Sequence, residues 1–119
     1  MSSLPPSHVR FLNVLNAIRQ LSPAGTLNAD EQVLLDLLIV QWHENERIAL
    51  SDLMHGNLGG SQSTTYRRLL ALNEKGFVRF GTSPTDKRVR FVEPTDLARK
   101  HMRAMDESLS GLFPPLQAN

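Results

Sequence analysis

The sequence contains no cysteine, which excludes disulfide bonds, thiolate metal sites and cysteine-based catalysis. It also lacks a run of about 18 apolar residues, the length that a membrane-spanning helix requires. Residues 1–8 show no basic segment followed by an apolar stretch, which a secretory signal needs. These absences predict a cytoplasmic protein with no membrane partner.

The chain has little net charge, but its charges are unevenly distributed. Its 119 residues carry a formal charge of +1. Residues 1–57 hold three basic and six acidic side chains, whereas residues 58–92 hold seven basic and two acidic ones. Such a basic segment is typical of proteins that bind polyanions, although a solvated basic face gives the same pattern.

Signals for catalysis or metal binding are weak. The four histidines are scattered, and a solvated helix end explains the group of His43, Glu44 and Glu46 better than a metal site does. The glycine-rich segment 56–61 lacks the lysine of a phosphate-binding loop. We therefore expect a protein that is not an enzyme and that has no metal and no cofactor.

Apolar spacing predicts helices in the first half of the chain. A stripe over residues 11–21 indicates a helix with Ser7 as its N-cap, and Asn28 with Glu31 resembles a capping box that opens a second helix. Residues 33–42 are apolar nearly all round that helix, so we expect it at the centre of the core.

Shorter elements follow. Residues 48–50 form a minimal strand candidate, Ser51 and Ser61 are N-cap candidates for two further helices, and Gly76 is a natural left-handed terminator of the second. Alternating patterns then predict a hairpin, with strands over 77–80 and 89–92. Finally, Pro94 can occupy the first turn of a last helix, which we expect over residues 94–112.

This order of elements is that of a winged helix-turn-helix, a mainly α fold with a small β-hairpin wing. In such folds a recognition helix enters the DNA major groove while the helix before it crosses the backbone. The basic segment coincides with the predicted recognition helix and hairpin. The fold and the charge distribution therefore both favour double-stranded DNA as the partner.

The sequence resembles the MarR family of bacterial transcription regulators. The motifs that carry the resemblance are LSDL at residues 50–53, SQSTTYR at 61–67, LNEKGFVR at 72–79, SPTDKR at 83–88 and EPT at 93–95. One departure is Arg68, at a position where the family usually has an apolar residue. A second is the segment 56–60, which is one residue longer than the family pattern.

The resemblance implies DNA contacts from the start of the recognition helix and from the wing. Carried over onto this chain, the DNA-binding residues are Ser61, Gln62, Ser63, Thr64, Tyr66, Arg67, Arg79, Asp86, Lys87 and Arg88.

Several of these side chains have the chemistry for their implied role. Gln62 can hydrogen-bond adenine and Arg67 guanine, whereas the hydroxyl of Ser61 can bind phosphate or serve as a cap alone. Tyr66 either stacks on the DNA backbone or packs against the wing.

In the wing, Arg88 is the candidate for the narrow, electronegative minor groove, and Lys87 for a phosphate contact. Asp86 cannot attract DNA by its charge. The family motif implies instead that it holds an arginine in place through a charge-assisted hydrogen bond, although an ordinary turn-forming aspartate fits the pattern too.

The resemblance also implies a homodimer formed through the N- and C-terminal helices. The expected organisation is one winged-helix domain over residues 1–119, with a dimerisation helix and linker (1–28), a DNA-binding lobe (29–93), a C-terminal helix (94–112) and a tail (113–119). Family members often bind a small aromatic effector in a cleft between the dimer helices and the DNA-binding lobe. Candidates for lining that cleft are His8, Phe11, Trp42 and Met54.

The sequence thus predicts a sequence-specific transcriptional regulator, a repressor that binds a pseudo-palindromic operator as a homodimer. Two alternatives stay open. The same fold serves as a protein-interaction module, in which case the basic strip is merely solvated, and it also serves in plasmid replication or partition.

Overall fold

The fold is described from a computed structural model, which covers residues 4–21, 24–56 and 61–112. Its elements are α1 (Ser7–Arg19), the 3₁₀ turn η1 (Ala24–Thr26), α2 (Ala29–Glu44), β1 (Ile48–Ala49), α3 (Leu50–His55), α4 (Gln62–Glu74), β2 (Val78–Thr82), β3 (Arg90–Pro94) and α5 (Asp96–Leu109). None of the helices in these ranges is long and apolar enough to cross a bilayer. The expected tail (113–119) and residues 57–60 of the glycine-rich segment lie outside the described residues.

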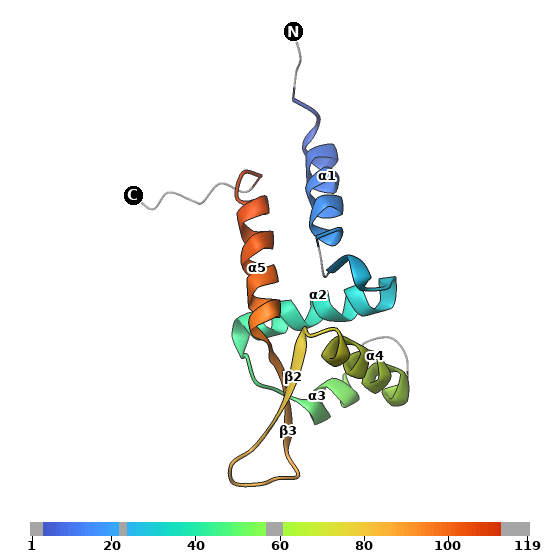
Figure 1. The fold of residues 1–119 in the computed structure, drawn as a ribbon, viewed down its shortest axis with the longest axis vertical. Coiled ribbons are helices and arrows are strands. Elements are labelled where there is room, and N and C mark those ends of the chain that lie inside the picture. The colour runs from blue at the N-terminus through green and yellow to red at the C-terminus, as the bar shows by residue number, and fades with distance from the viewer. Residues whose placement is uncertain (1–3, 22–23, 57–60, 113–119) are drawn as a thin grey trace, which may run out of the picture.

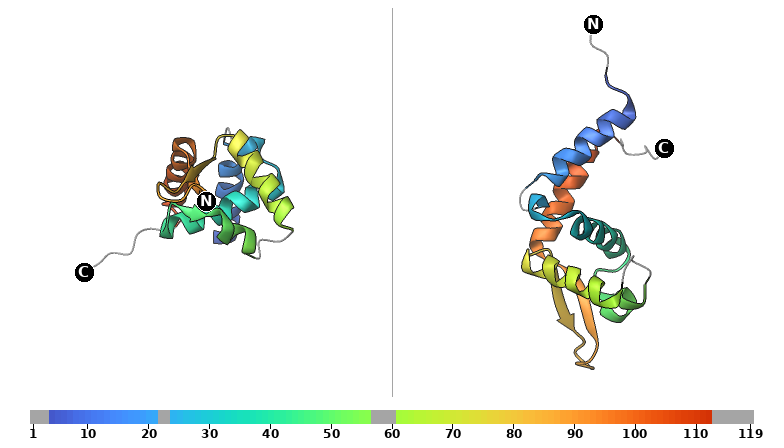
Figure 2. Two further views of the ribbon diagram at one scale, coloured as in Figure 1. Left: turned by 90° about the horizontal axis from the view of Figure 1, so that it is seen from below. Right: turned by 90° about the vertical axis from the view of Figure 1, so that its right-hand side faces the viewer.

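The molecule has two ends (Figure 1). Helices α1 and α5 pack against each other at one end, with α2 running across below them. At the other end, α3, α4 and the hairpin of β2 and β3 project away from α1 and α5. Figure 2 shows the same separation in a view turned by 90°. We call β2, β3 and their connection, residues 78–94, the wing.

Helix α2 supplies one wall of the core. Leu35 and Leu38 are fully buried, and the Trp42 indole N–H donates a hydrogen bond of 3.2 Å to the backbone carbonyl of Val92 in β3. The opposite side of α2 exposes three apolar side chains: Val33, Leu37 and Val40. The prediction that α2 lies at the centre of the core is therefore wrong in part: α2 contributes four buried apolar side chains to the core, but only one of its faces is covered in a single chain.

Two of the predicted helix starts are confirmed. Asn28 accepts from the Glu31 backbone N–H at 2.8 Å while the Glu31 carboxylate accepts from the Asn28 N–H at 2.9 Å, which completes a capping box. Ser61 caps α4 by accepting from the Thr64 N–H at 3.2 Å. Gly76, with a φ of 90°, follows the end of α4 in the left-handed conformation that glycine adopts without strain.

Three other predicted starts are wrong by one or two residues. Ser7 lies inside the first turn of α1 and makes no cap, and Ser51 lies inside α3 because β1 ends at Ala49 and the helix begins at once. Pro94 ends β3 instead of opening α5, whose N-cap is Thr95. Proline is tolerated at position 94 because β1 pairs with β3 only through residues 91 and 92. On that side of β3, no strand needs a backbone N–H from residue 94.

The three strands form an antiparallel sheet in the order β1-β3-β2. Val78 pairs with Pro94 and Thr82 with Arg90, so the hairpin extends beyond the short β1. The predicted hairpin is confirmed, with each strand beginning one residue later in the chain than expected. Beyond β1 the wing is a two-stranded ribbon, an arrangement of marginal stability without further support.

Candidate nucleic-acid interface

The start of α4 carries a cluster of hydroxyl groups. The Ser61 Oγ lies 2.9 Å from the Thr64 Oγ1 and 3.1 Å from the Ser63 Oγ, in addition to its cap contact. Local bonding therefore already occupies the Ser61 hydroxyl. A helix start has backbone N–H groups with no acceptor inside the helix and carries the positive end of the helix dipole, so this terminus attracts anions.

One side of α4 is turned toward solvent. Gln62, Ser63 and Arg67 are exposed, whereas the opposite side anchors the helix through Thr65, Leu69 and Leu72. None of the ion pairs found among the described residues involves Arg67. The exposed side therefore presents an amide, a hydroxyl and a free guanidinium, three groups that can read base edges or bind phosphates.

Tyr66 connects α4 to the wing. Its ring centroid lies 6.5 Å from that of Phe80 in β2, at an interplanar angle of 40°. The Arg90 guanidinium covers the same Phe80 ring at 4.9 Å. Of the two roles considered for Tyr66, packing against the wing is the one observed, and this contact joins α4 to the hairpin.

The tip of the wing holds the Asp86–Arg88 pair that the family motif implies. Asp86 accepts from the Arg88 backbone N–H at 3.0 Å, from its Nε at 3.2 Å and from its terminal guanidinium nitrogen at 3.4 Å. Hydrogen bonds from the Arg88 side chain and then from its backbone lower the pKa of the Asp86 carboxyl. The Arg88 side chain is 92% exposed. Asp86 therefore holds a guanidinium that extends into solvent.

Much of the basic segment is neutralised within the protein. Arg68 pairs with Asp30 at 3.4 Å, Lys75 with Glu31 at 2.6 Å and Arg79 with Glu93 at 3.1 Å. The Arg68 contact joins α4 to the start of α2. Among the described basic residues of 58–92, those without an ion pair are Arg67, Lys87 and Arg90.

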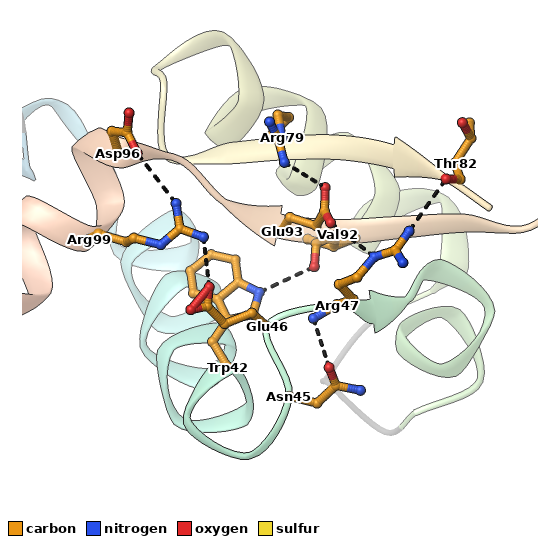
Figure 3. Close-up of polar contacts among 10 residues, drawn as sticks. All are labelled: Trp42, Asn45, Glu46, Arg47, Arg79, Thr82, Val92, Glu93, Asp96 and Arg99. Atoms are coloured by element: carbon orange, nitrogen blue, oxygen red, sulfur yellow. Dashed lines mark hydrogen bonds and ion pairs between the residues drawn. The ribbon is translucent and has the colours of Figure 1, made fainter. Parts of the chain in front are cut away.

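The base of the wing contains two functional candidates that sequence reasoning missed, Arg47 and Glu93. Figure 3 shows the Glu93 carboxylate between the guanidinium groups of Arg79 and Arg47. Arg47 lies 46 residues from Glu93 in the sequence, and no local pattern indicates that they meet.

The residues expected to line an effector cleft do not come together in one chain. Trp42 belongs to the core, whereas Met54 lines a pocket between α3 and the wing. His8 and Phe11 lie beside Leu112, in a groove between α1 and the end of α5. In the described ranges, no three histidine or acidic side chains are grouped closely enough to hold a metal ion.

Comparisons with known proteins bear on the fold. No protein-family model matches the sequence, and curated proteins give no match either. Among solved structures, transcriptional regulator Tm0710 from Thermotoga maritima matches with a TM-score of 0.63 and 18% identity over 87% of this chain and 69% of that one.

Two further matches are complexes with DNA. Reduced AbfR bound to DNA gives a TM-score of 0.55 and 22% identity over 87% of this chain and 73% of that one. A mutant MarR from E. coli complexed with operator DNA gives a TM-score of 0.56 and 18% identity over 93% of this chain and 79% of that one. The described helices, strand order and wing, together with these matches, show that the chain has the winged-helix fold of MarR-type transcription regulators.

Proposed function

We propose that the protein is a sequence-specific DNA-binding transcriptional regulator. The observation that carries the proposal is the presence, at one end of the molecule, of the exposed side of α4 and of the exposed Arg88 on the wing (Figure 1). A helix start with free N–H groups suits the major groove, and a projecting arginine suits the minor groove beside it. The matched AbfR and MarR complexes with DNA support the same assignment.

Within this proposal the ten predicted contact residues divide into three groups. Gln62 and Arg67 read bases, and the hydroxyls of Ser63 and Thr64 bind phosphate next to the capping Ser61. On the wing, Arg88 enters the minor groove, Asp86 orients it and Lys87 binds phosphate. Tyr66 packs on Phe80 and Arg79 pairs with Glu93, so in this proposal they hold α4 and the base of the wing, respectively.

We further propose that the working unit is a homodimer formed through α1 and α5. Phe11 and Leu12 on α1 are 39% and 51% exposed, and the groove beside Leu112 is open. A second copy would cover these apolar side chains, which lie at the end of the molecule away from the wing. A two-fold dimer would place its α4 helices in successive major grooves about 34 to 36 Å apart, so the operator would be a pseudo-palindrome.

In this account the regulator represses by occluding a promoter, and it acts in the cytoplasm with the DNA. Residues 1–28 and 94–112 form the dimerisation part and residues 29–93 the DNA-binding lobe. A small aromatic effector stays a prediction, and its candidate position is the groove near His8 and Phe11, which the second copy would close over.

The test is fluorescence anisotropy of labelled DNA from the upstream region of the protein's own gene, over a range of salt concentrations. The expected result is an affinity that falls steeply with salt, with a slope of about −0.9 per neutralised phosphate. Arg88→Ala should weaken binding to all sequences, whereas Gln62→Ala should change base preference by about 1 to 3 kcal/mol at one position. Binding that does not respond to salt would favour the protein-interaction module instead.

A matched control is Lys100→Ala at an exposed position of α5, outside α4 and the wing, in a variant that light scattering shows to keep the oligomeric state of the parent. This variant removes the same unit of charge as Arg88→Ala does. If it weakens binding equally, general electrostatic attraction, and not the positioned contacts of α4 and the wing, accounts for the affinity. Light scattering at micromolar concentration tests the dimer, and a monomer would contradict it.

A further inference from the structure

The base of the wing holds an ion cluster in which two partly exposed arginines meet one enclosed carboxylate. The Glu93 side chain, on β3, is only 13% exposed. Its Oε1 accepts from a terminal nitrogen of Arg79 on β2 at 3.1 Å, and its Oε2 accepts from the Nε of Arg47 at 3.1 Å. One carboxylate therefore joins both wing strands to the segment between α2 and β1 (Figure 3).

Arg47 makes the widest set of contacts in the cluster. Its guanidinium lies 4.1 Å from the centroid of the Phe91 ring, in a cation–π contact, and donates to the Thr82 carbonyl at 3.4 Å. Its backbone N–H donates to the Asn45 side chain at 3.0 Å. Arg47 thus reaches the last residue of β2 as well as β3, from outside the hairpin.

A glycine leaves room for this arrangement. A Cβ atom at Gly81 would lie 2.6 Å from the Glu93 Oε1 and 3.1 Å from its Cδ. Those distances are shorter than van der Waals contact, so any larger residue at position 81 would displace the carboxylate from the two guanidinium groups. Gly81 is also paired with Phe91, the residue under Arg47.

We propose that Arg47, Glu93 and Arg79 form a clamp that sets the direction of the wing, and that Arg47 and Glu93 are positioning residues for DNA binding that do not contact DNA. The proposal rests on the proposed function for its consequence. Its physical basis is independent, because the ribbon beyond β1 has only two strands. Arg47 joins Glu93, on the core side of the three-stranded part of the sheet, to Thr82, where the two-stranded ribbon leaves that part. Without the clamp, the wing would hold Arg88 in many orientations. Binding would then have to order the wing, and that entropy cost would lower the affinity for DNA.

The first test measures wing motion in the free protein. Because the chain has no cysteine, Thr85→Cys at the wing tip gives a single attachment site for a nitroxide spin label. The expected result is a sharper, more mobile electron paramagnetic resonance spectrum in Arg47→Ala, in Glu93→Gln and in Gly81→Ala than in the labelled parent. Gly81→Ala is the most specific variant, since it alters no charge.

Two controls match these variants. Gly111→Ala places a methyl group where no atom lies within 4 Å, and Arg103→Ala removes an exposed arginine from α5. Neither should change the spectrum. If the spectra of Arg47→Ala and of Gly81→Ala are the same as that of the parent, the clamp does not exist. Should one variant fail to fold, the other decides.

The second test measures DNA affinity against salt for the same variants. Loss of the clamp should weaken binding about 3- to 10-fold, the order expected for a partly exposed ion network, and leave the salt slope unchanged. Arg88→Ala, which removes a phosphate-proximal charge, should reduce the slope by about 1. If Arg47→Ala reduces the slope by that amount, Arg47 contacts phosphate itself and the positioning role is wrong.

The two tests separate the clamp from the proposed function. A parent protein that binds no DNA overturns the function, while the spectra of the free variants still decide whether the clamp holds the wing. A parent that binds DNA, with variants that keep both its affinity and its wing spectrum, overturns the clamp alone.

Discussion

Lys75 belongs to the basic segment, yet its contacts make it part of the scaffold. Its Nζ lies 2.6 Å from the Glu31 Oε1 and 2.8 Å from the Thr26 carbonyl, so it joins the end of α4 to the start of α2. The Glu31 side chain is only 8% exposed. We therefore expect Lys75→Ala to reduce stability while leaving the salt dependence of DNA binding unchanged.

The magnitude follows from what the substitution leaves behind. Breaking a fully buried ion pair by removing one partner costs about 3 to 5 kcal/mol, because the other charge stays buried without a counter-ion. Here the Lys75 side chain is 32% exposed, and Glu31 keeps its hydrogen bond from the Asn28 N–H. About half of that cost, roughly 2 kcal/mol, is the expected loss, which for a chain of this length lowers Tm by roughly 6 to 10 °C.

Urea denaturation at fixed protein concentration measures the loss, with Lys100→Ala as the exposed control. The double variant Lys75→Ala/Glu31→Gln should be less destabilised than the sum of its single variants, since it removes both charges. A loss below about 0.5 kcal/mol for Lys75→Ala, or a reduced salt slope in DNA binding, would refute the assignment of Lys75 to the scaffold.

The same pair has a pH signature. Burial raises the pKa of Glu31, but the hydrogen bonds from Lys75 and Asn28 and the charge of Lys75 outweigh it, so the pKa falls below 4.5. A carboxyl whose pKa is lower in the folded than in the unfolded chain stabilises the fold at pH values above its unfolded-state pKa. This contribution is lost as the pH falls through the folded-state pKa. The stability difference between the parent and Lys75→Ala should therefore shrink below about pH 4.5.

Further outcomes concern the wing and the core. Asp86→Asn makes the wing more positive yet frees Arg88, so DNA affinity should fall several-fold; tighter binding, measured by anisotropy, would mean that net charge matters more than the orientation of Arg88. His101 is buried against Phe77, its Nε2 has no hydrogen-bond partner among the described residues, and burial, opposed by the charge of Asp36, lowers its pKa from 6.5. The unfolded chain therefore takes up the proton first, and stability should decline as the pH falls below about 6.5. His101→Phe should abolish that part of the decline in urea titrations at pH 7 and 5, and an unchanged decline would contradict the cause.

Local features of the fold could be predicted from the sequence because they depend on residues three or four positions apart. The Asn28 capping box, the Ser61 cap and the glycine end of α4 are of this kind. Ser51 shows the limit of such reasoning. A hydroxyl residue before an apolar helix is a good cap in isolation, but pairing between β1 and β3 fixes where the strand ends and α3 begins.

Only the parts of the candidate site that depend on residues close together in the sequence could be predicted. The exposed side of α4 and the Asp86–Arg88 pair follow from helical spacing and from a two-residue separation. The partners of Lys75 and Glu93 lie 44 and 46 residues away, respectively. Counting charges placed Lys75 in the basic segment and Arg47 outside it, because a sequence does not show which carboxylates fold against these cations.

The central claim is that α4 and the wing form a sequence-specific DNA interface. Selection of bound DNA from a random pool tests this claim most directly. The expected result is enrichment of an inverted repeat whose half-site centres lie about 10 base pairs apart, since a two-fold dimer presents one α4 to each successive major groove. Selection with Gln62→Ala should then relax the preference at one position of each half-site. A pool that shows no enriched motif, with binding unaffected by Gln62→Ala and Arg88→Ala, would contradict the account.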